Sequence, residues 1–93
     1  MAETIELKFA VSTAQPFQAV RIEGRHPAGP EIFLRVQRWE QGRWQAFPLP
    51  TKTDQSGYFT AHVEFGQPGL HRVRVIDPDS TARSEPFKLR IEG

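Results

Sequence analysis

Three histidines, His26, His62 and His71, are the side chains best suited to bind a metal ion or to transfer a proton. A metal or catalytic site needs several such groups at one point, and no pair of these histidines has a helical or hairpin spacing that would bring them together. We expect His62 to point outward from a strand, His71 to point inward or to lie at a corner, and His26 to lie in a loop. Because cysteine is absent, a cysteine-based zinc site is excluded. The sequence therefore predicts no metal site and no cofactor.

Residues 77–80, Asp-Pro-Asp-Ser, bring oxygen-bearing side chains close together. Calcium takes roughly six to eight oxygen ligands. This segment supplies only Asp77, Asp79 and Ser80, and Glu85 lies further along the chain. A solvated turn in which aspartate caps backbone N–H groups is the simpler interpretation. Calcium binding is the alternative that the sequence leaves open.

The serines show no sign of nucleophilic catalysis. Ser12, Ser56, Ser80 and Ser84 lie in polar segments, without the flanking glycines of a nucleophile elbow and without a paired histidine. A glycine-rich loop that would hold a phosphate is also absent from the sequence. We therefore expect no catalytic residue and no enzymatic activity.

The elements that must position any site are strands. Seven segments alternate apolar and polar residues, and none shows a sustained helical period. They span residues 4–11, 17–25, 31–40, 43–49, 57–65, 70–77 and 86–92. Turn-forming residues separate them, a pattern typical of an all-β sandwich. We predict an antiparallel β-sandwich of seven strands, with a small open barrel as the alternative.

The inward members of these strands should form the core, because alternate residues of a strand share one face. The predicted core residues are Ile22, Leu34, Val36, Trp44, Phe59, Val63, Val73, Val75 and Leu89. In the first strand the same period places Ile5, Leu7, Phe9 and Val11 on one face.

Two turns are marked by residue type. Gln41-Gly42 predicts a short hairpin. In residues 53–59 the Asp54 side chain can accept bonds from backbone groups two residues on, and Gly57 can take the positive φ that closes the turn. We expect Gly57 to have a positive φ or a close backbone neighbour.

One face of the predicted sandwich combines cations with aromatic rings. If the strands at 31–40, 70–77 and 86–92 share a sheet, their outward residues form a basic face. Its members are Phe33, Arg35, Gln37, Trp39, Arg72, Arg74, Lys88 and Arg90. The face suits an acidic partner, such as a neighbouring domain, a protein or a glycan, with nucleic acid less favoured. The alternative is a solvated surface on which arginine stems cover exposed rings.

Composition fits one ordinary globular domain over residues 1–93. The chain is 38% hydrophobic and 25% charged, with a net charge of +1. No apolar run approaches the length of about 20 residues that spans a bilayer, so we expect no membrane insertion. The N-terminus alternates like a strand rather than forming the apolar core of a signal peptide. Either the protein is made in the cytosol or it is a domain cut from a longer chain, and we favour the second interpretation.

Four stretches carry a resemblance to a known family. They are residues 34–44 (LRVQRWEQGRW), 53–59 (TDQSGYF), 68–69 (PG) and 82–86 (ARSEP). Together they resemble the motifs of bacterial immunoglobulin-like domains, over residues 20–91, and those at 53–59 and 68–69 also resemble the carboxypeptidase regulatory-like domain. The resemblance implies an immunoglobulin-like fold and an extracellular or cell-envelope location. His71 stands where the family usually has tyrosine, so an imidazole must replace the phenol in any tyrosine-corner hydrogen bond.

The sequence thus predicts a non-catalytic module. We expect it to serve as a structural spacer or interaction domain of a larger exported bacterial protein. The alternative is a glycan- or protein-binding module that uses the basic face.

Overall fold

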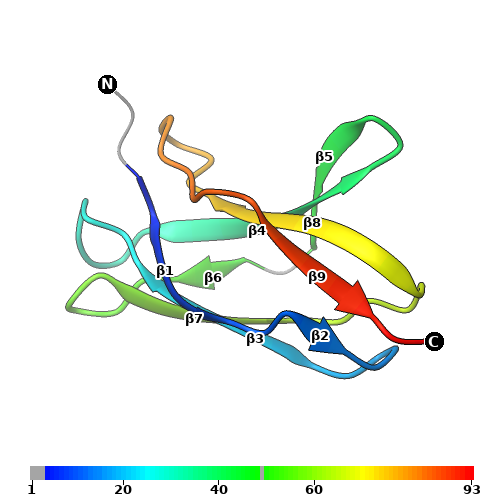
Figure 1. Cartoon of the computed structure of the whole chain (residues 1–93). Coiled ribbons are helices and arrows are strands. Elements are labelled where there is room, and N and C mark those ends of the chain that lie inside the picture. Colours follow the sequence, from blue (N-terminus) through cyan, green and yellow to red (C-terminus); the bar gives the residue numbers. More distant parts are fainter. Residues whose placement is uncertain (1–3, 49) are drawn as a thin grey trace.

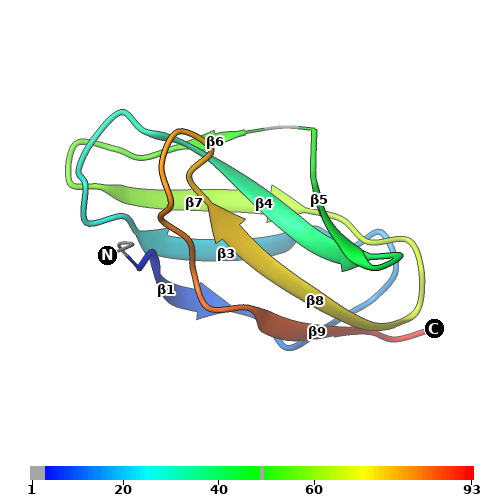
Figure 2. The same ribbon diagram turned by 90° about the horizontal axis from the view of Figure 1, so that it is seen from above.

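The computed structural model describes residues 4–48 and 50–93, and these form nine strands without a helix. The strands are β1 (Glu6–Ala10), β2 (Thr13–Ala14), β3 (Val20–Arg25), β4 (Phe33–Glu40), β5 (Arg43–Ala46), β6 (Thr51–Lys52), β7 (Tyr58–Val63), β8 (Gly69–Ile76) and β9 (Phe87–Ile91). They build two sheets that face each other (Figures 1 and 2). The smaller sheet has the order β1-β3-β7, and the larger has the order β2-β9-β8-β4-β5, with β6 paired to β4. The predicted all-β sandwich is confirmed.

The seven expected strands are all present, at β1, β3, β4, β5, β7, β8 and β9. The short strands β2 and β6 were not predicted, because two residues are too few to show a period. β2 pairs with β9 in parallel, so the chain leaves the smaller sheet after β1 and joins the larger one. The segment expected as a strand from Phe17 begins at Val20 instead, since Phe17 has a φ of 63° and cannot lie in a strand. The segment expected to end at Leu49 ends at Ala46, and Leu49 lies outside the described residues.

The inward side chains of both sheets form one apolar core. It contains Ile22, Leu34, Val36, Phe59, Val63, Val73, Val75 and Leu89, as predicted. Phe65, Ile5 and Ile91 are also buried in it. A Cβ at position 24 would clash with the backbone carbonyl oxygen of Glu6 and would lie 2.8 Å from the Phe59 ring, so glycine is the residue that fits there. The period-two pattern therefore identified most of the core.

Two predicted orientations are wrong. Trp44 is half-buried and is not part of the core, because it pairs across the hairpin with Trp39 and must share Trp39's outward face. Phe9 is exposed, since the register of β1 against β3 shifts between Leu7 and Phe9. An extra residue in a bulge reverses the alternation beyond it.

Both predicted turns are confirmed. Gln41 and Gly42 have φ of 53° and 81°, the signs of a type I′ hairpin turn. Asp54 Oδ1 accepts bonds from the N–H of Ser56 at 2.8 Å and of Tyr58 at 3.0 Å. Gly57 has a φ of 83°, and a Cβ there would lie 2.8 Å from the carbonyl oxygen of His26. Gly57 therefore meets both conditions that the sequence suggested.

Candidate interaction face

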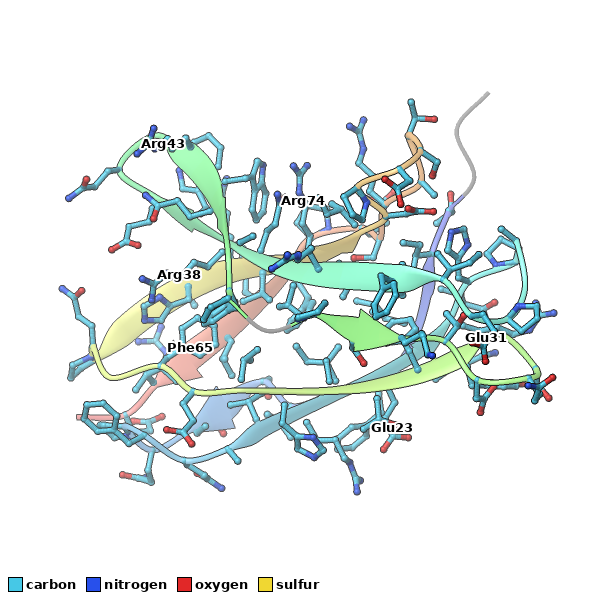
Figure 3. All side chains as sticks on the ribbon, turned by 180° about the vertical axis from the view of Figure 1, so that it is seen from behind. Glu23, Glu31, Arg38, Arg43, Phe65 and Arg74 are labelled. Atoms are coloured by element: carbon cyan, nitrogen blue, oxygen red, sulfur yellow. The ribbon has the colours of Figure 1, made fainter. Side chains whose placement is uncertain are left out.

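The larger sheet places the predicted basic residues on one outer surface. β4, β8 and β9 are neighbours, with Gln37 opposite Arg74 and Arg72 opposite Lys88. Arg35, two residues before Gln37 on β4, lies opposite Ile76. We use the name basic face for the outward residues Arg35, Gln37, Trp39, Arg72, Arg74, Lys88 and Arg90, together with Trp44. Figure 3 shows Arg74 on this side of the sandwich and Glu23 on the opposite side.

A stacked group of side chains lies at the centre of the basic face. The guanidinium carbon of Arg74 lies 4.3 Å from the centroid of the Trp44 ring, and Arg74 Nε donates to Gln37 Oε1 at 2.8 Å. Trp39 meets Trp44 edge to face, with ring centroids 5.4 Å apart. Arg74 is thus fixed by a cation–π contact and a hydrogen bond, which limits its rotamers before any partner arrives.

The remaining predicted residues lie around this centre. Arg35 Nη1 donates to the carbonyl oxygens of Phe47 and Pro48, at 3.3 and 3.1 Å, so its charge is partly committed to the backbone. Phe33 lies apart from the group, against β6, where the Lys52 amine is 5.5 Å from its ring centroid. Arg90 is exposed on β9, opposite Leu70.

Charge is distributed differently on the two outer surfaces. On the smaller sheet Lys8 pairs with Glu6 at 2.6 Å and Arg21 pairs with Glu23 at 2.8 Å. On the basic face none of the five cations forms an ion pair with a carboxylate of residues 4–48 and 50–93. Arg72 and Lys88 stand directly opposite each other, and like charges in that position destabilise a sheet.

A cleft of about 480 Å³ adjoins the basic face, between β5 and the loop before β9. It is lined by Thr4, Trp44, Arg74, Arg83, Ser84, Glu85 and Pro86. Burial, and after it the nearby charge of Arg83, lower the pKa of Arg74 below its ordinary value. Sequence reasoning missed this cleft because Arg83 and Glu85 lie in an irregular loop. The orientation of Trp44, in contrast, could have been predicted from the sequence, since a two-residue turn at Gln41-Gly42 sets Trp44 opposite Trp39.

His71 lies at a corner, and its imidazole makes the hydrogen bond that the tyrosine phenol makes in a tyrosine corner. Its Nε2 lies 2.8 Å from the carbonyl oxygen of Gln67, four residues earlier, and the carbonyl can only accept, so Nε2 carries the proton. The ring also packs on Phe65, with centroids 4.8 Å apart. This is the geometry of a tyrosine corner with imidazole in place of phenol.

His62 is exposed on β7, as expected.

His26 makes a contact that sequence reasoning missed. It lies in a loop, as expected, but it is 1% exposed, and its Nε2 lies 3.0 Å from Oδ2 of Asp77. Asp77 is 6% exposed, so the expectation of a solvated turn at residues 77–80 is wrong for this residue. The expected capping is present, because the Asp79 N–H donates to Asp77 Oδ1 at 2.9 Å. No sequence signal joins two residues that lie 51 positions apart.

Neither a metal cluster nor a membrane-spanning helix is found in the described part of the chain. Residues 4–48 and 50–93 contain no group of three or more histidine, cysteine, aspartate or glutamate side chains placed to hold a metal ion. Within those residues no helix is long and apolar enough to cross a membrane.

Comparison with known proteins defines the class of fold. No protein-family model and no curated protein matches this chain. The structure is similar to the superoxide reductase (neelaredoxin) from Ignicoccus hospitalis, with a TM-score of 0.59 and 10% identity over 96% of this chain and 80% of that one. It is also similar to the PKD domain of an M14-like peptidase from Thermoplasmatales archaeon SCGC AB-540-F20, with a TM-score of 0.55 and 10% identity over 100% of this chain and 98% of that one.

At this level of identity the likeness concerns the fold alone, since one fold hosts many functions. The fold is an immunoglobulin-like all-β sandwich, which confirms the predicted fold class. The bacterial origin and the likeness to carboxypeptidase regulatory domains stay predictions.

Proposed function

We propose that this domain is a non-catalytic module of a larger, exported bacterial protein, and that it binds a negatively charged partner through the basic face. The observation that carries the proposal is the cross-strand pair of Arg72 and Lys88, neither of which forms an ion pair with a carboxylate of the described residues. Folding brings these two cations together at a cost in free energy. An anionic partner between them removes that cost, so binding gains both the attraction and the relief of repulsion.

The smaller sheet supports this interpretation by contrast. There, Lys8 and Arg21 have glutamate neighbours, so the fold can supply counter-charges on an exposed sheet. The outward positions of β4, β8 and β9 carry no acidic residue. Trp39, on the outward side of β4, is 43% exposed. Tryptophan and arginine are the residue types that most often dominate binding energy at protein interfaces.

The experiment uses the intrinsic fluorescence of the chain. Its two tryptophans, Trp39 and Trp44, both lie on the basic face, so a ligand there changes their emission. We expect titration with polygalacturonate at low ionic strength to give a saturable change that weakens as salt is added. The double variant Arg72→Ala, Lys88→Ala should lose roughly tenfold in affinity, since exposed charge contacts contribute up to about 1 kcal/mol each.

The matched control removes two cations from the smaller sheet. Lys8→Ala, Arg21→Ala changes the net charge by the same amount and should bind as the wild type does. Equal losses in both double variants would indicate that net charge, and not the basic face, drives binding. No response to polygalacturonate, heparin or polyglutamate would overturn the proposal.

A spacer role is the second candidate. The first residues of β1 and the last residues of β9 lie at opposite ends of the sandwich in both views (Figures 1 and 2). The longest principal extent of the domain is 38 Å. Inserted in a longer chain, such a domain separates its neighbours by about its own length. Small-angle scattering of the parent protein, with and without this domain, tests the role through the change in its maximum dimension.

A further inference from the structure

The cleft beside the basic face is built on fixed backbone. Arg83 pairs with Thr4 and with Ile76, and its carbonyl oxygen accepts from the Ile5 N–H at 3.0 Å. Next to it, the Ser84 N–H donates to the carbonyl oxygen of Val75 at 2.8 Å, and Ser84 Oγ accepts from the Val75 N–H at 2.9 Å. The loop that carries Arg83 and Glu85 is therefore bonded to β8 on one side and to the segment at Thr4 and Ile5 on the other.

Two arginines from different elements, Arg74 on β8 and Arg83 in the loop before β9, line this cleft. Arg74 is oriented by its hydrogen bond to Gln37 and by the Trp44 ring, and only its Nε is engaged by a described residue. No hydrogen bond from a described residue engages its two terminal nitrogens. These form a planar fork, the geometry that recognises a carboxylate through paired hydrogen bonds. Arg83 lines the same cleft as Arg74, and its charge adds to burial in lowering the pKa of Arg74. Neither arginine forms an ion pair with any carboxylate of residues 4–48 and 50–93.

Glu85 lines the same cleft and narrows the choice of ligand. Its carboxylate accepts hydrogen bonds and repels a second anion. A DNA phosphodiester, or the side chain of aspartate or glutamate, has no O–H donor beside its negative charge at neutral pH. A sugar acid carries a carboxylate and several hydroxyl donors on one ring. It therefore matches two arginines and one glutamate at the same time.

We propose that this cleft is the subsite for one uronic acid unit of an acidic polysaccharide. Arg74 and Arg83 hold the sugar carboxylate, Glu85 accepts from a ring hydroxyl, and Trp44 forms a wall of the cleft. The polysaccharide chain continues over Arg72 and Lys88, which carry cations on adjacent strands of the same surface. This inference rests on the proposed function and adds the class of ligand to it.

Glu85→Gln gives the sharpest test, because the proposal and simple charge attraction predict opposite signs. Loss of a negative charge strengthens the binding of any polyanion held by charge alone. In the subsite, the same change weakens the acceptor for the sugar hydroxyl. We expect Glu85→Gln to weaken binding of oligogalacturonate by about fivefold, since hydrogen bonds to charged groups are stronger than neutral ones, and to strengthen binding of polyglutamate. Glu85 is exposed, and an unchanged melting temperature confirms that the variant folds.

Arg74→Lys tests the fork separately. Lysine keeps the charge but presents a single ammonium group in place of paired N–H donors. We expect the wild type to bind oligogalacturonate more tightly than dextran sulfate, and Arg74→Lys to bind both without this preference. Neutral galactan oligosaccharide, which has the ring but not the carboxylate, should not bind the wild type.

The outcomes separate the subsite from the proposed function. If Glu85→Gln binds both oligogalacturonate and polyglutamate more tightly, the subsite is wrong and the basic face remains a general anion-binding surface. If the wild type prefers polyglutamate to oligogalacturonate, the partner is an acidic protein segment and the subsite is likewise wrong. If none of these polyanions binds, the proposed function fails together with the subsite.

Discussion

His26 and Asp77 form a buried pair that joins two loops at one end of the sandwich. His26 Nε2 lies 3.0 Å from Asp77 Oδ2, and the Ala28 N–H donates to the other ring nitrogen, Nδ1, at 3.3 Å. Because Nδ1 accepts, the proton of a neutral ring must lie on Nε2, and the Nε2–H donates a hydrogen bond to the carboxylate. The pair therefore connects the loop after β3 to the turn after β8 without requiring a charged histidine.

The ionised Asp77 carboxylate should contribute to the free energy of unfolding, and this contribution should be lost at acidic pH. Burial acts to raise the pKa of Asp77, but hydrogen bonds from His26, from the Asp79 N–H and from Ser80 outweigh it and lower the pKa below its ordinary value of 3.8. A group whose pKa falls on folding stabilises the folded state above its unfolded pKa, and this contribution is lost as the pH falls through the folded pKa. We therefore expect the free energy of unfolding of the wild type to decrease as the pH is lowered through the folded pKa of Asp77.

The variant Asp77→Asn should remove this part of the acid dependence. At neutral pH we expect a loss of about 1–3 kcal/mol, because the amide is a weaker partner for the His26 N–H. Asp79→Asn, at an exposed position, is the matched control and should behave as the wild type. Identical acid unfolding of Asp77→Asn and wild type would show that the pair contributes nothing to the pH dependence.

Gly57→Ala and Gly42→Ala separate backbone strain from a steric clash. Both glycines have φ near 80°, but a Cβ at Gly57 meets the His26 carbonyl at 2.8 Å, whereas a Cβ at Gly42 meets nothing within 4 Å. We expect Gly42→Ala to cost roughly 1–2 kcal/mol and Gly57→Ala to cost at least about 1 kcal/mol more. Urea unfolding of the two variants measures the difference, and equal costs would argue against the close contact.

Phe59→Ala tests the inward face of β7. Phe59 is buried in the core and covers Gly24. Its truncation should lower the free energy of unfolding by about 3–5 kcal/mol. Phe33→Ala, at an exposed position on β4, should change it by less than about 0.5 kcal/mol. Similar losses in the two variants would show that the inward face of β7 is misassigned.

Lys88→Glu tests the repulsion on the basic face without a ligand. Arg72 then faces an opposite charge across the ladder in place of a like charge. We expect a gain in stability of about 0.2–1 kcal/mol, largest at low ionic strength and reduced by salt because exposed charges are screened. If the gain is missing at every salt concentration, the two cations do not repel each other measurably.

The sequence predicted this fold where the physics is local. Alternation placed β4, β8 and β9 and the outward direction of Arg72 and Arg74, because period two follows from strand geometry alone. Alternation failed for Phe9, since a single extra residue at a bulge reverses it and leaves no composition signal. It failed for Trp44 for a different reason. The hairpin turn already fixed Trp44 opposite Trp39, and that constraint outweighs its apolar character.

The candidate site was predictable only in part. The cations of the basic face come from regular strands, so their common surface followed from the sandwich pairing. The cleft depends on Arg83 and Glu85, whose loop is held by bonds to β8 and to Ile5 that no spacing predicts. The same holds for His26 and Asp77, which lie 51 positions apart and follow strands of different sheets.

We propose that a negatively charged partner binds the outer surface of the larger sheet. Titration of the ¹⁵N-labelled domain with oligogalacturonate, followed through backbone amide shifts, tests it most directly. We predict progressive shifts confined to β4, β5, β8, β9 and the loop at Arg83, with the amides of β3 and β7 unchanged. Shifts centred on the smaller sheet, or no shifts at high ligand concentration and low salt, would contradict this proposal. The spacer role would then be the remaining candidate.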